Sequence, residues 1–460
     1  MKIKIVALAI GALFSSGLMA AQTNSFVNIE QRLALLEQRL INAERRASDA
    51  EAQIQRLRQQ QRVTAPATPA VKAESAEPTI SAAAPAGLTL SGYGDIKIYG
   101  DVEFNMDAAS RTGSLTSIRT SASKNQTPGS NERWDINGRI LLGLDGLRRM
   151  DNGNFAGFSA QPLADMSGRM NLDDALFFFG REDDWKVKVG RFEAYDMFPL
   201  NQDTFIEYSG NTANDLYSDG YGYIYMMKEG RGRSNGGNFL VSKTLDNWYF
   251  ELNSLVEDGS TLFQDSNYHG YALENKKNVA YLRPVIAWNN GRFSTAVAME
   301  KNVVDNAYGY YANGSHWVDQ SERTGYGWTM SWNGAKTNPE DGVTTNLNVA
   351  WMDAPDEKDF TAGINSLWRR FELGYIYAHN RIDRFSDASD GCDDNCWIAD
   401  VGSYDIHTVH ASYLLPDIMN MENFNIYLGA YASWLEANPS FGEKHEDSRY
   451  GARVRFKYFF

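Results

Sequence analysis

The last eleven residues of the chain, 450–460, alternate between apolar and polar side chains. One parity is apolar or aromatic from Tyr450 to Phe460, and the other carries Arg453, Arg455 and Lys457. Successive side chains of a strand point to opposite faces, so this segment predicts a strand with one apolar and one cationic face. A soluble domain rarely exposes such an edge strand. A barrel in a bilayer needs one, with lipid outside and water inside. The pattern therefore predicts the closing strand of a transmembrane barrel, and a half-buried strand of a soluble sandwich is the alternative.

The same alternation runs through much of the preceding chain. In the first run, Ile96, Ile98 and Phe104 share the even parity, whereas Asp101 and Glu103 share the odd parity. Dividing about 370 residues by roughly 23 residues for each strand and its connection gives about 16 strands, with 14 or 18 as alternatives. The predicted fold class is all-β, a transmembrane antiparallel β-barrel.

The connections between these runs are of two kinds. Asp151-Asn152-Gly153 and Asn289-Asn290-Gly291 are tight hairpin signals. Residues 107–131, 300–325 and 380–404 instead form long polar stretches. Short turns that alternate with long loops are typical of outer-membrane barrels, in which the turns are periplasmic and the loops extracellular.

The N-terminal part of the chain predicts a different organisation. Lys2 and Lys4 precede an apolar run and then small residues, so residues 1–21 predict a secretory signal peptide. Residues 22–61 predict a periplasmic α-helical coiled coil, and residues 62–86 an Ala/Pro-rich linker. The barrel is then expected over residues 87–460. No other stretch approaches the roughly 18 apolar residues of a spanning helix.

The coiled-coil prediction depends on an unbroken heptad seam. The seam positions are Ile29, Leu33, Leu36, Leu40, Ala43, Ala47, Ala50, Ile54 and Leu57. Leu at position a with Ile or Leu at position d is poorly suited to a dimer, and Arg at g with Glu at e favours parallel association. The seam therefore predicts a parallel homotrimer.

Composition narrows the possible partners. The net charge of −14 argues against nucleic acid and against a pore that attracts phosphate. Aromatic residues make up 13% of the chain and Tyr leads them with 24, enough for two interfacial girdles and lumen sites. The two cysteines, Cys392 and Cys396, lie in a polar loop, and in an oxidising compartment they predict a disulfide. The acidic residues beside them are interpreted as solvated, so no metal site is expected.

A signal peptide, a heptad stalk, an Ala/Pro linker and a barrel that ends in Lys457-Tyr458-Phe459-Phe460 together resemble the outer-membrane glycoporins of enteric bacteria. The resemblance is to the raffinose-porin type, and more distantly to sucrose porins and maltoporins. It covers the whole chain and implies a trimeric channel in the outer membrane of a Gram-negative bacterium. Phosphate-selective porins can also carry an N-terminal coiled coil, so the resemblance is less specific for the solute.

In trimeric porins the third extracellular loop narrows the barrel, and the resemblance places that loop at residues 193–215. The expected constriction residues are acidic or aromatic: Glu193, Tyr195, Asp196, Phe198, Asp203, Phe205, Glu207 and Tyr208. Sugars bind through hydroxyl hydrogen bonds and through ring faces on aromatics, whereas a phosphate channel would need Lys or Arg there. The alternative is an ordinary exposed loop with solvated acids.

Two further sets of residues occupy strand positions whose side chains are expected to face the lumen. The resemblance sets a cationic wall against the constriction loop, and the candidates are Arg139, Lys97, Arg453 and Arg455. Arg453 and Arg455 have an alternative role at the periplasmic rim. An aromatic lane for sugars is predicted at Tyr93, Tyr99, Tyr249, Tyr427 and Tyr431, for which girdle positions near strand ends are the alternative.

The function indicated is passive, partly selective diffusion of oligosaccharides, with no cofactor. Catalysis is not expected, because His407 and His410 would lie on opposite faces of a strand and no protease or nucleophile motif is present. A general cation-favouring porin and an anion porin are the alternatives within transport, and a stalked tether is the structural one. The expected partners are oligosaccharides, outer-membrane lipid and lipopolysaccharide, and two further copies of the chain.

Overall fold

The computed structural model describes residues 94–110, 133–192, 236–263, 266–268, 271–312, 314–383, 402–439 and 444–460. All of them belong to the second of two compact units, Ser75–Phe460. The predicted signal peptide, coiled coil and linker lie outside the described residues. So do Tyr93, the whole of the predicted constriction loop, Cys392 and Cys396.

Sixteen antiparallel strands close into one barrel, as the alternation predicted. The first eight are β1 (Asp95–Ala109), β2 (Arg133–Arg149), β3 (Asn154–Asp165), β4 (Met170–Arg181), β5 (Trp185–Arg191), β6 (Gly237–Leu245), β7 (Trp248–Asp258) and β11 (Asn278–Asn289). The second eight are β12 (Phe293–Asn302), β15 (Thr324–Asn333), β16 (Val343–Ala354), β17 (Glu357–Trp368), β18 (Phe371–Ile382), β19 (Gly402–Leu415), β20 (Phe424–Pro439) and β21 (His445–Phe459).

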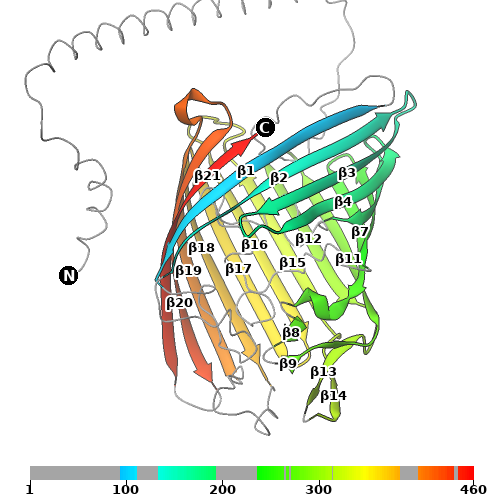
Figure 1. Cartoon of the computed structure of the whole chain (residues 1–460), viewed down its shortest axis with the longest axis vertical. Coiled ribbons are helices and arrows are strands. Elements are labelled where there is room, and N and C mark those ends of the chain that lie inside the picture. Colours follow the sequence, from blue (N-terminus) through cyan, green and yellow to red (C-terminus); the bar gives the residue numbers. More distant parts are fainter. Residues whose placement is uncertain are drawn as a thin grey trace, which may run out of the picture. The chain divides into compact units, whose positions relative to one another are not determined.

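The predicted closing strand is the one that closes the ring. β21 pairs with β20 on one side and with β1 on the other, with Asp101 opposite Phe459 and Asp107 opposite Arg453. Figure 1 shows β21, in red, beside β1, in blue. Hydrogen bonds join the first and last strands, so the barrel leaves no strand edge unpaired.

Seven short connections lie at one end of the barrel, which we call the short-turn end. They include the predicted hairpin turns at residues 150–153 and 290–292, where Gly153 and Gly291 adopt φ of 83° and 87°. Positive φ is the conformation that Gly supplies without steric cost. The predicted separation of short turns at one end from long loops at the other is incomplete, because a two-residue turn at 355–356 joins β16 to β17 at the opposite end.

One predicted loop is a folded element. Residues 300–325 include the hairpin of β13 (Tyr308–Ala312) and β14 (His316–Asp319), which forms a small sheet with β10 (Glu274–Asn275). The neighbouring connection holds η1 (Gly259–Leu262), β8 (Asn267–Tyr268) and β9 (Tyr271–Ala272). We call these two connections, residues 259–277 and 303–323, the insert. Figure 1 shows β13 and β14 at the end of the barrel away from the C terminus.

The outer face of the barrel is apolar and carries large exposed side chains. At the short-turn end these include Trp248, Trp332, Trp368, Phe371 and Tyr413, and at the other end Tyr326, Trp351, Phe360 and Trp434. Aromatic residues at both ends of an apolar band are typical of barrels in a bilayer. A short 3₁₀ segment, η3 (Ile418–Asn420), lies in the turn between β19 and β20. No helix within the described ranges is both long and apolar enough to span a bilayer.

Candidate functional site

The inner face of the barrel is polar where the outer face is apolar. On β1, Asp101, Glu103 and Asn105 are buried on the inside, whereas Ile98 and Met106 are about half exposed on the outside. The predicted parity of this strand is therefore confirmed. Such alternation puts hydrogen-bonding side chains along the lumen and apolar side chains toward lipid.

Charged side chains on β1, β2 and β21 form one network on the inner face, which we call the seam cluster. Its members are Asp101, Glu103, Asp107, Arg139, Arg453, Arg455 and Lys457. The network follows from register, because β21 places Lys457 opposite Glu103 and Arg453 opposite Asp107, with Arg455 between them opposite Asn105. Opposite charges that face each other across a strand pair stabilise the pairing.

Most members of the seam cluster have more than one polar partner. Glu103 Oε1 lies 2.9 Å from Arg455 Nη2, and Glu103 Oε2 lies 3.1 Å from Lys457 Nζ. Arg453 contacts Asp107 through two nitrogens, with Nη2 2.7 Å from Oδ2. Arg139 is the loosest member, with Nε 3.8 Å from Asp101 Oδ1. These contacts give the cluster four cations and three carboxylates.

Two asparagines extend the hydrogen bonds of this network. Asn105 Nδ2 donates to Asn137 Oδ1 at 2.8 Å, and Asn137 Nδ2 donates to Asp107 Oδ2 at 2.8 Å. Arg455 Nε also donates to Asn105 Oδ1 at 2.8 Å. Hydrogen bonds shared in this way lower the cost of burying the charges, although Asp101 Oδ1 and Arg139 Nε have no hydrogen-bond partner among the described residues.

The residues predicted as a cationic wall thus face the lumen, but they also pair with carboxylates of their own wall. Arg139, Arg453 and Arg455 belong to the seam cluster. Lys97 lies with its Nζ 5.1 Å from the ring centroid of Tyr99. Arg453 and Arg455 do not serve only as rim charges, because their partners lie along the inner face of β1.

Two tyrosines of the predicted aromatic lane lie flat along the wall over glycines. Tyr99 is opposite Gly143, and Tyr431 is opposite Gly451. A Cβ on Gly143 would come within 2.3 Å of the Tyr99 ring, and one on Gly451 within 2.7 Å of Tyr431 Oη. Because the glycine removes the side chain beneath it, each ring can lie against the backbone.

The tyrosine hydroxyl of Tyr99 is also held in place. It donates to Asp145 Oδ1 at 3.2 Å and accepts from Gln161 Nε2 at 2.8 Å. Tyr249 also faces inward and donates to Glu251, and Tyr427 faces inward opposite Arg455. Four of the five predicted lane residues therefore share the inner face.

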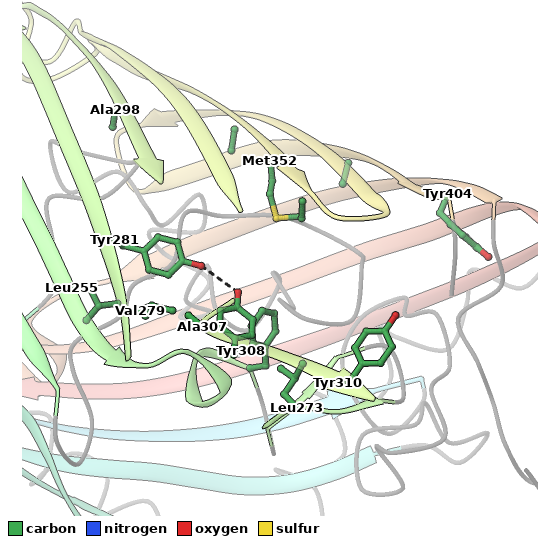
Figure 2. Packing of buried hydrophobic residues seen from close by; sticks show 14 of the residues in the cluster. Leu255, Leu273, Val279, Tyr281, Ala298, Ala307, Tyr308, Tyr310, Met352 and Tyr404 are labelled. Carbon is green, nitrogen blue, oxygen red and sulfur yellow. Dashed lines mark hydrogen bonds between the residues drawn. The ribbon is translucent and has the colours of Figure 1, made fainter. Parts of the chain in front are cut away.

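A second inward-facing region was not predicted. The insert packs against the inner face of β7 and β11, where Tyr308 fits over Gly259 and Val279. Its hydroxyl lies 3.3 Å from that of Tyr281, as Figure 2 shows. Burial raises the pKa of Tyr308, so this phenol stays protonated and available as a hydrogen-bond donor. The tyrosines at positions 308, 310 and 311 could have indicated that this connection packs against the barrel wall.

Arg283 on β11 forms an ion pair with Glu300 on β12. Arg283 Nε lies 3.2 Å from Glu300 Oε2, and neither side chain is exposed. The guanidinium of Arg323, the last residue of the insert, lies 5.0 Å from the ring centroid of Phe263. An inward-facing arginine in a strand of apolar residues was the only sequence signal of this pair.

The two histidines predicted to lie on opposite faces do so. His407 stacks on Trp434 on the outer face, and Tyr375 Oη lies 2.6 Å from His407 Nδ1. His410 is buried on the inner face, over Gly374. Within the described ranges, no three or more His, Cys, Asp or Glu side chains are arranged to hold a metal ion.

Comparisons with known proteins give one family and one fold. The sequence profile of the family described as porin-like glycoporin RafY matches residues 98–460. No protein in a set of curated proteins matches. The chain is similar in structure to the outer-membrane channel DcaP of Acinetobacter baumannii, at 11% identity and a TM-score of 0.51 over 81% of this chain and 100% of that one.

Two further solved structures share the fold. OprB of Pseudomonas putida has 10% identity and a TM-score of 0.50 over 79% of this chain and 94% of its own. OmpF of Salmonella typhi, solved with daunomycin, has 10% identity and a TM-score of 0.50 over 80% of this chain and 98% of its own. At this identity the likeness concerns the fold alone.

Proposed function

The chain belongs to the porin-like glycoporin RafY family, and from this premise we propose that it is an outer-membrane porin for the passive diffusion of oligosaccharides of the raffinose or sucrose type into the periplasm. The channel uses no cofactor and no energy source. It is not an enzyme.

The observation that carries the proposal is the geometry of Tyr99. Its ring lies flat over Gly143, and Gln161 and Asp145 are hydrogen-bonded to its hydroxyl. A sugar needs an apolar surface for its ring face beside groups that pair with its hydroxyls. Tyr99 with its two partners offers both, and Tyr431 over Gly451 offers a second ring face farther along the wall, level with Ala109 of β1.

A general, cation-favouring diffusion porin is the second candidate, and an anion-selective porin is less favoured. The net charge of −14 supports cation preference. The seam cluster opposes a strong anion preference, because its cations already contact carboxylates of β1. An exposed row of unpaired guanidinium groups would instead support an anion-selective porin.

The channel is proposed to work as a homotrimer with a periplasmic stalk. Residues 1–21 are the signal peptide, 22–61 the coiled coil, 62–86 the linker and 87–460 the barrel domain. The predicted constriction residues of 193–215 and a disulfide between Cys392 and Cys396 belong to the same proposal. Deleting residues 22–61 should leave single-channel conductance nearly unchanged, since the stalk organises the trimer and does not line the pore.

The test is ion conductance through the purified full-length protein in a planar bilayer during titration with raffinose, sucrose and maltodextrins. Saturable block in steps of one third of the conductance is the expected result for a trimeric sugar channel. Weaker block in Tyr99→Ala and Tyr431→Ala would assign the binding to the tyrosines. Large open steps that no sugar affects would overturn the sugar proposal and leave a general porin.

A further inference from the structure

The inner wall formed by β7, β11 and β12 holds polar atoms that the fold itself does not use. Asn253 on β7 is fully enclosed, and among the described residues neither its Nδ2 nor its Oδ1 has a hydrogen-bond partner. Arg283 on β11 is equally enclosed, and both of its terminal nitrogens, Nη1 and Nη2, lack a partner within the same ranges. Enclosed polar groups without partners are rare in folded proteins, and each needs an explanation.

These two side chains are neighbours. Asn253 is directly opposite Arg283 in the pairing of β7 with β11, and both project from the inner face. Side chains that face each other across an antiparallel pair have Cβ atoms about 5 Å apart. One ligand can therefore reach the amide of Asn253 and the guanidinium of Arg283 together.

The charge of Arg283 is already balanced. Its Nε lies 3.2 Å from Glu300 Oε2, and the two side chains form an ion pair without exposure to solvent. The terminal nitrogens that remain are therefore donors within a pair of zero net charge. An anion bound to them would also have to lie near the carboxylate of Glu300.

The free atoms differ in their hydrogen-bonding character. Nη1 and Nη2 of Arg283 only donate, whereas the amide of Asn253 offers a donating NH2 group and an accepting oxygen. An ionised carboxylate has no proton to give to Asn253 Oδ1, and a phosphate ion, which can give one, would bring its negative charge close to the carboxylate of Glu300. Two neighbouring hydroxyls of a sugar can do both, since each hydroxyl donates one proton and accepts through its lone pairs.

We propose that Asn253 and Arg283, with Glu300 as the neutralising partner, form a binding site for neighbouring hydroxyls of a neutral sugar. We call these three residues the diol site. This inference rests on the proposed function and adds a second contact point, on strands other than those of the Tyr99 and Tyr431 lane.

The test uses the full-length protein in planar bilayers, with Asn253→Leu as the main variant. Leu keeps a similar volume and removes both polar atoms without changing any charge. Block by raffinose should become about tenfold weaker, the effect of losing one or two net hydrogen bonds. Conductance without sugar and the reversal potential should stay unchanged.

The matched control is Asn346→Leu on β16. Asn346 also faces the lumen, but its Oδ1 already accepts from Ser331 Oγ at 2.7 Å. Raffinose block should change little in this control. Asn253→Ser, which retains a donor and an acceptor, should recover part of the affinity. Heat-dependent migration of the barrel on a gel shows whether each variant folds.

The outcomes separate this inference from the proposed function. Raffinose block that is normal in wild type and equally strong in Asn253→Leu would overturn the diol site and leave the sugar porin standing. Equal weakening in Asn253→Leu and Asn346→Leu would also overturn it. Absence of block by any sugar in wild type would overturn both. Inorganic phosphate that blocks wild type but not Asn253→Leu would show an anion site instead.

Discussion

The two inner walls of this barrel use charge in opposite ways. On the wall of β1, β2 and β21, the seam cluster spreads four cations over three carboxylates and two asparagines. On the wall of β7, β11 and β12, Arg283 and Glu300 face each other without exposure, and the remaining guanidinium nitrogens have no described partner. Most charges of the first wall contact more than one neighbour, whereas on the second wall Arg283 has Glu300 as its ion-pair partner.

This difference separates structural from binding roles. The seam cluster lies where the first and last strands meet, so its contacts help to close the barrel and leave few free donors for a solute. The diol site leaves donors and an acceptor free beside a neutral ion pair. Selective binding is therefore expected where hydrogen-bonding capacity is unused, and not where charge is most dense.

The largest expected effect is on stability and comes from Arg283→Met. This variant leaves Glu300 enclosed without its cation, and breaking a buried pair typically costs about 3–5 kcal/mol. Arg453→Met on the seam should cost only about 1–2 kcal/mol, because Asp107 keeps the amide of Asn137 as a donor. Unfolding in urea from lipid vesicles, followed by tryptophan fluorescence, measures both.

The double variant Arg283→Met with Glu300→Leu is the control for this prediction. Replacing both partners removes the uncompensated charge and should restore most of the lost stability. Equal losses for Arg283→Met and Arg453→Met would contradict the contrast between the walls.

The next effect is on sugar binding at the seam wall. In Gly143→Ala the new Cβ must push the Tyr99 ring off the backbone, since the two would lie only 2.3 Å apart. Losing the ring contact should weaken raffinose block about fivefold, or about 1 kcal/mol. Tyr99→Phe keeps the ring in place and should weaken the block less. Unchanged block in Gly143→Ala would show that the ring does not contact the sugar.

The barrel could be predicted from the sequence because the signal is periodic. Each spanning strand must place apolar residues outward at every second position, and 450–460 shows this over its whole length. The number of strands and the two hairpin turns follow from that periodicity and from local turn chemistry. The lumen orientation of Arg139, Arg453 and Arg455 follows from parity alone.

The pairing within the lumen could not be predicted in the same way. Parity says that Arg453 faces inward, but not that it lies opposite Asp107, because the register between the first and last strands is set only when the barrel closes. The insert was missed for a similar reason. The burial of Tyr308 depends on contacts with Val279 on β11 and Gly259 in η1, and the sequence around Tyr308 does not say that these two residues lie beside it.

A smaller effect is expected on ion selectivity. Glu103 contacts both Arg455 and Lys457, so Glu103→Gln leaves one more positive charge on the lumen wall. One unit charge acting across roughly 7 Å of water contributes about 0.6 kcal/mol, unfavourable for a cation and favourable for an anion, so the cation-to-anion permeability ratio should fall about sevenfold. Reversal potentials in a salt gradient should shift toward anions by this amount.

The control for this variant is Asp353→Asn. Asp353 is exposed and pairs with Lys358 at 3.7 Å, and it lies on the outer parity of β16. It removes the same charge away from the lumen and should leave the reversal potential unchanged. A shift of the same size in both variants would mean that selectivity reflects net charge and not the seam wall.

The smallest effect is expected for Lys243→Met, and it tests whether distance or burial decides the value of an ion pair. Lys243 Nζ lies 2.6 Å from Asp184 Oδ1, closer than Arg283 is to Glu300, but the two side chains are 50% and 36% exposed. Water solvates both partners when the pair is broken, so unfolding should become easier by no more than about 0.5 kcal/mol. Urea unfolding under the conditions used for Arg283→Met gives the comparison directly. A loss as large as that of Arg283→Met would mean that enclosure is not what distinguishes the wall of β7, β11 and β12, and the contrast between the two walls would then need another physical cause.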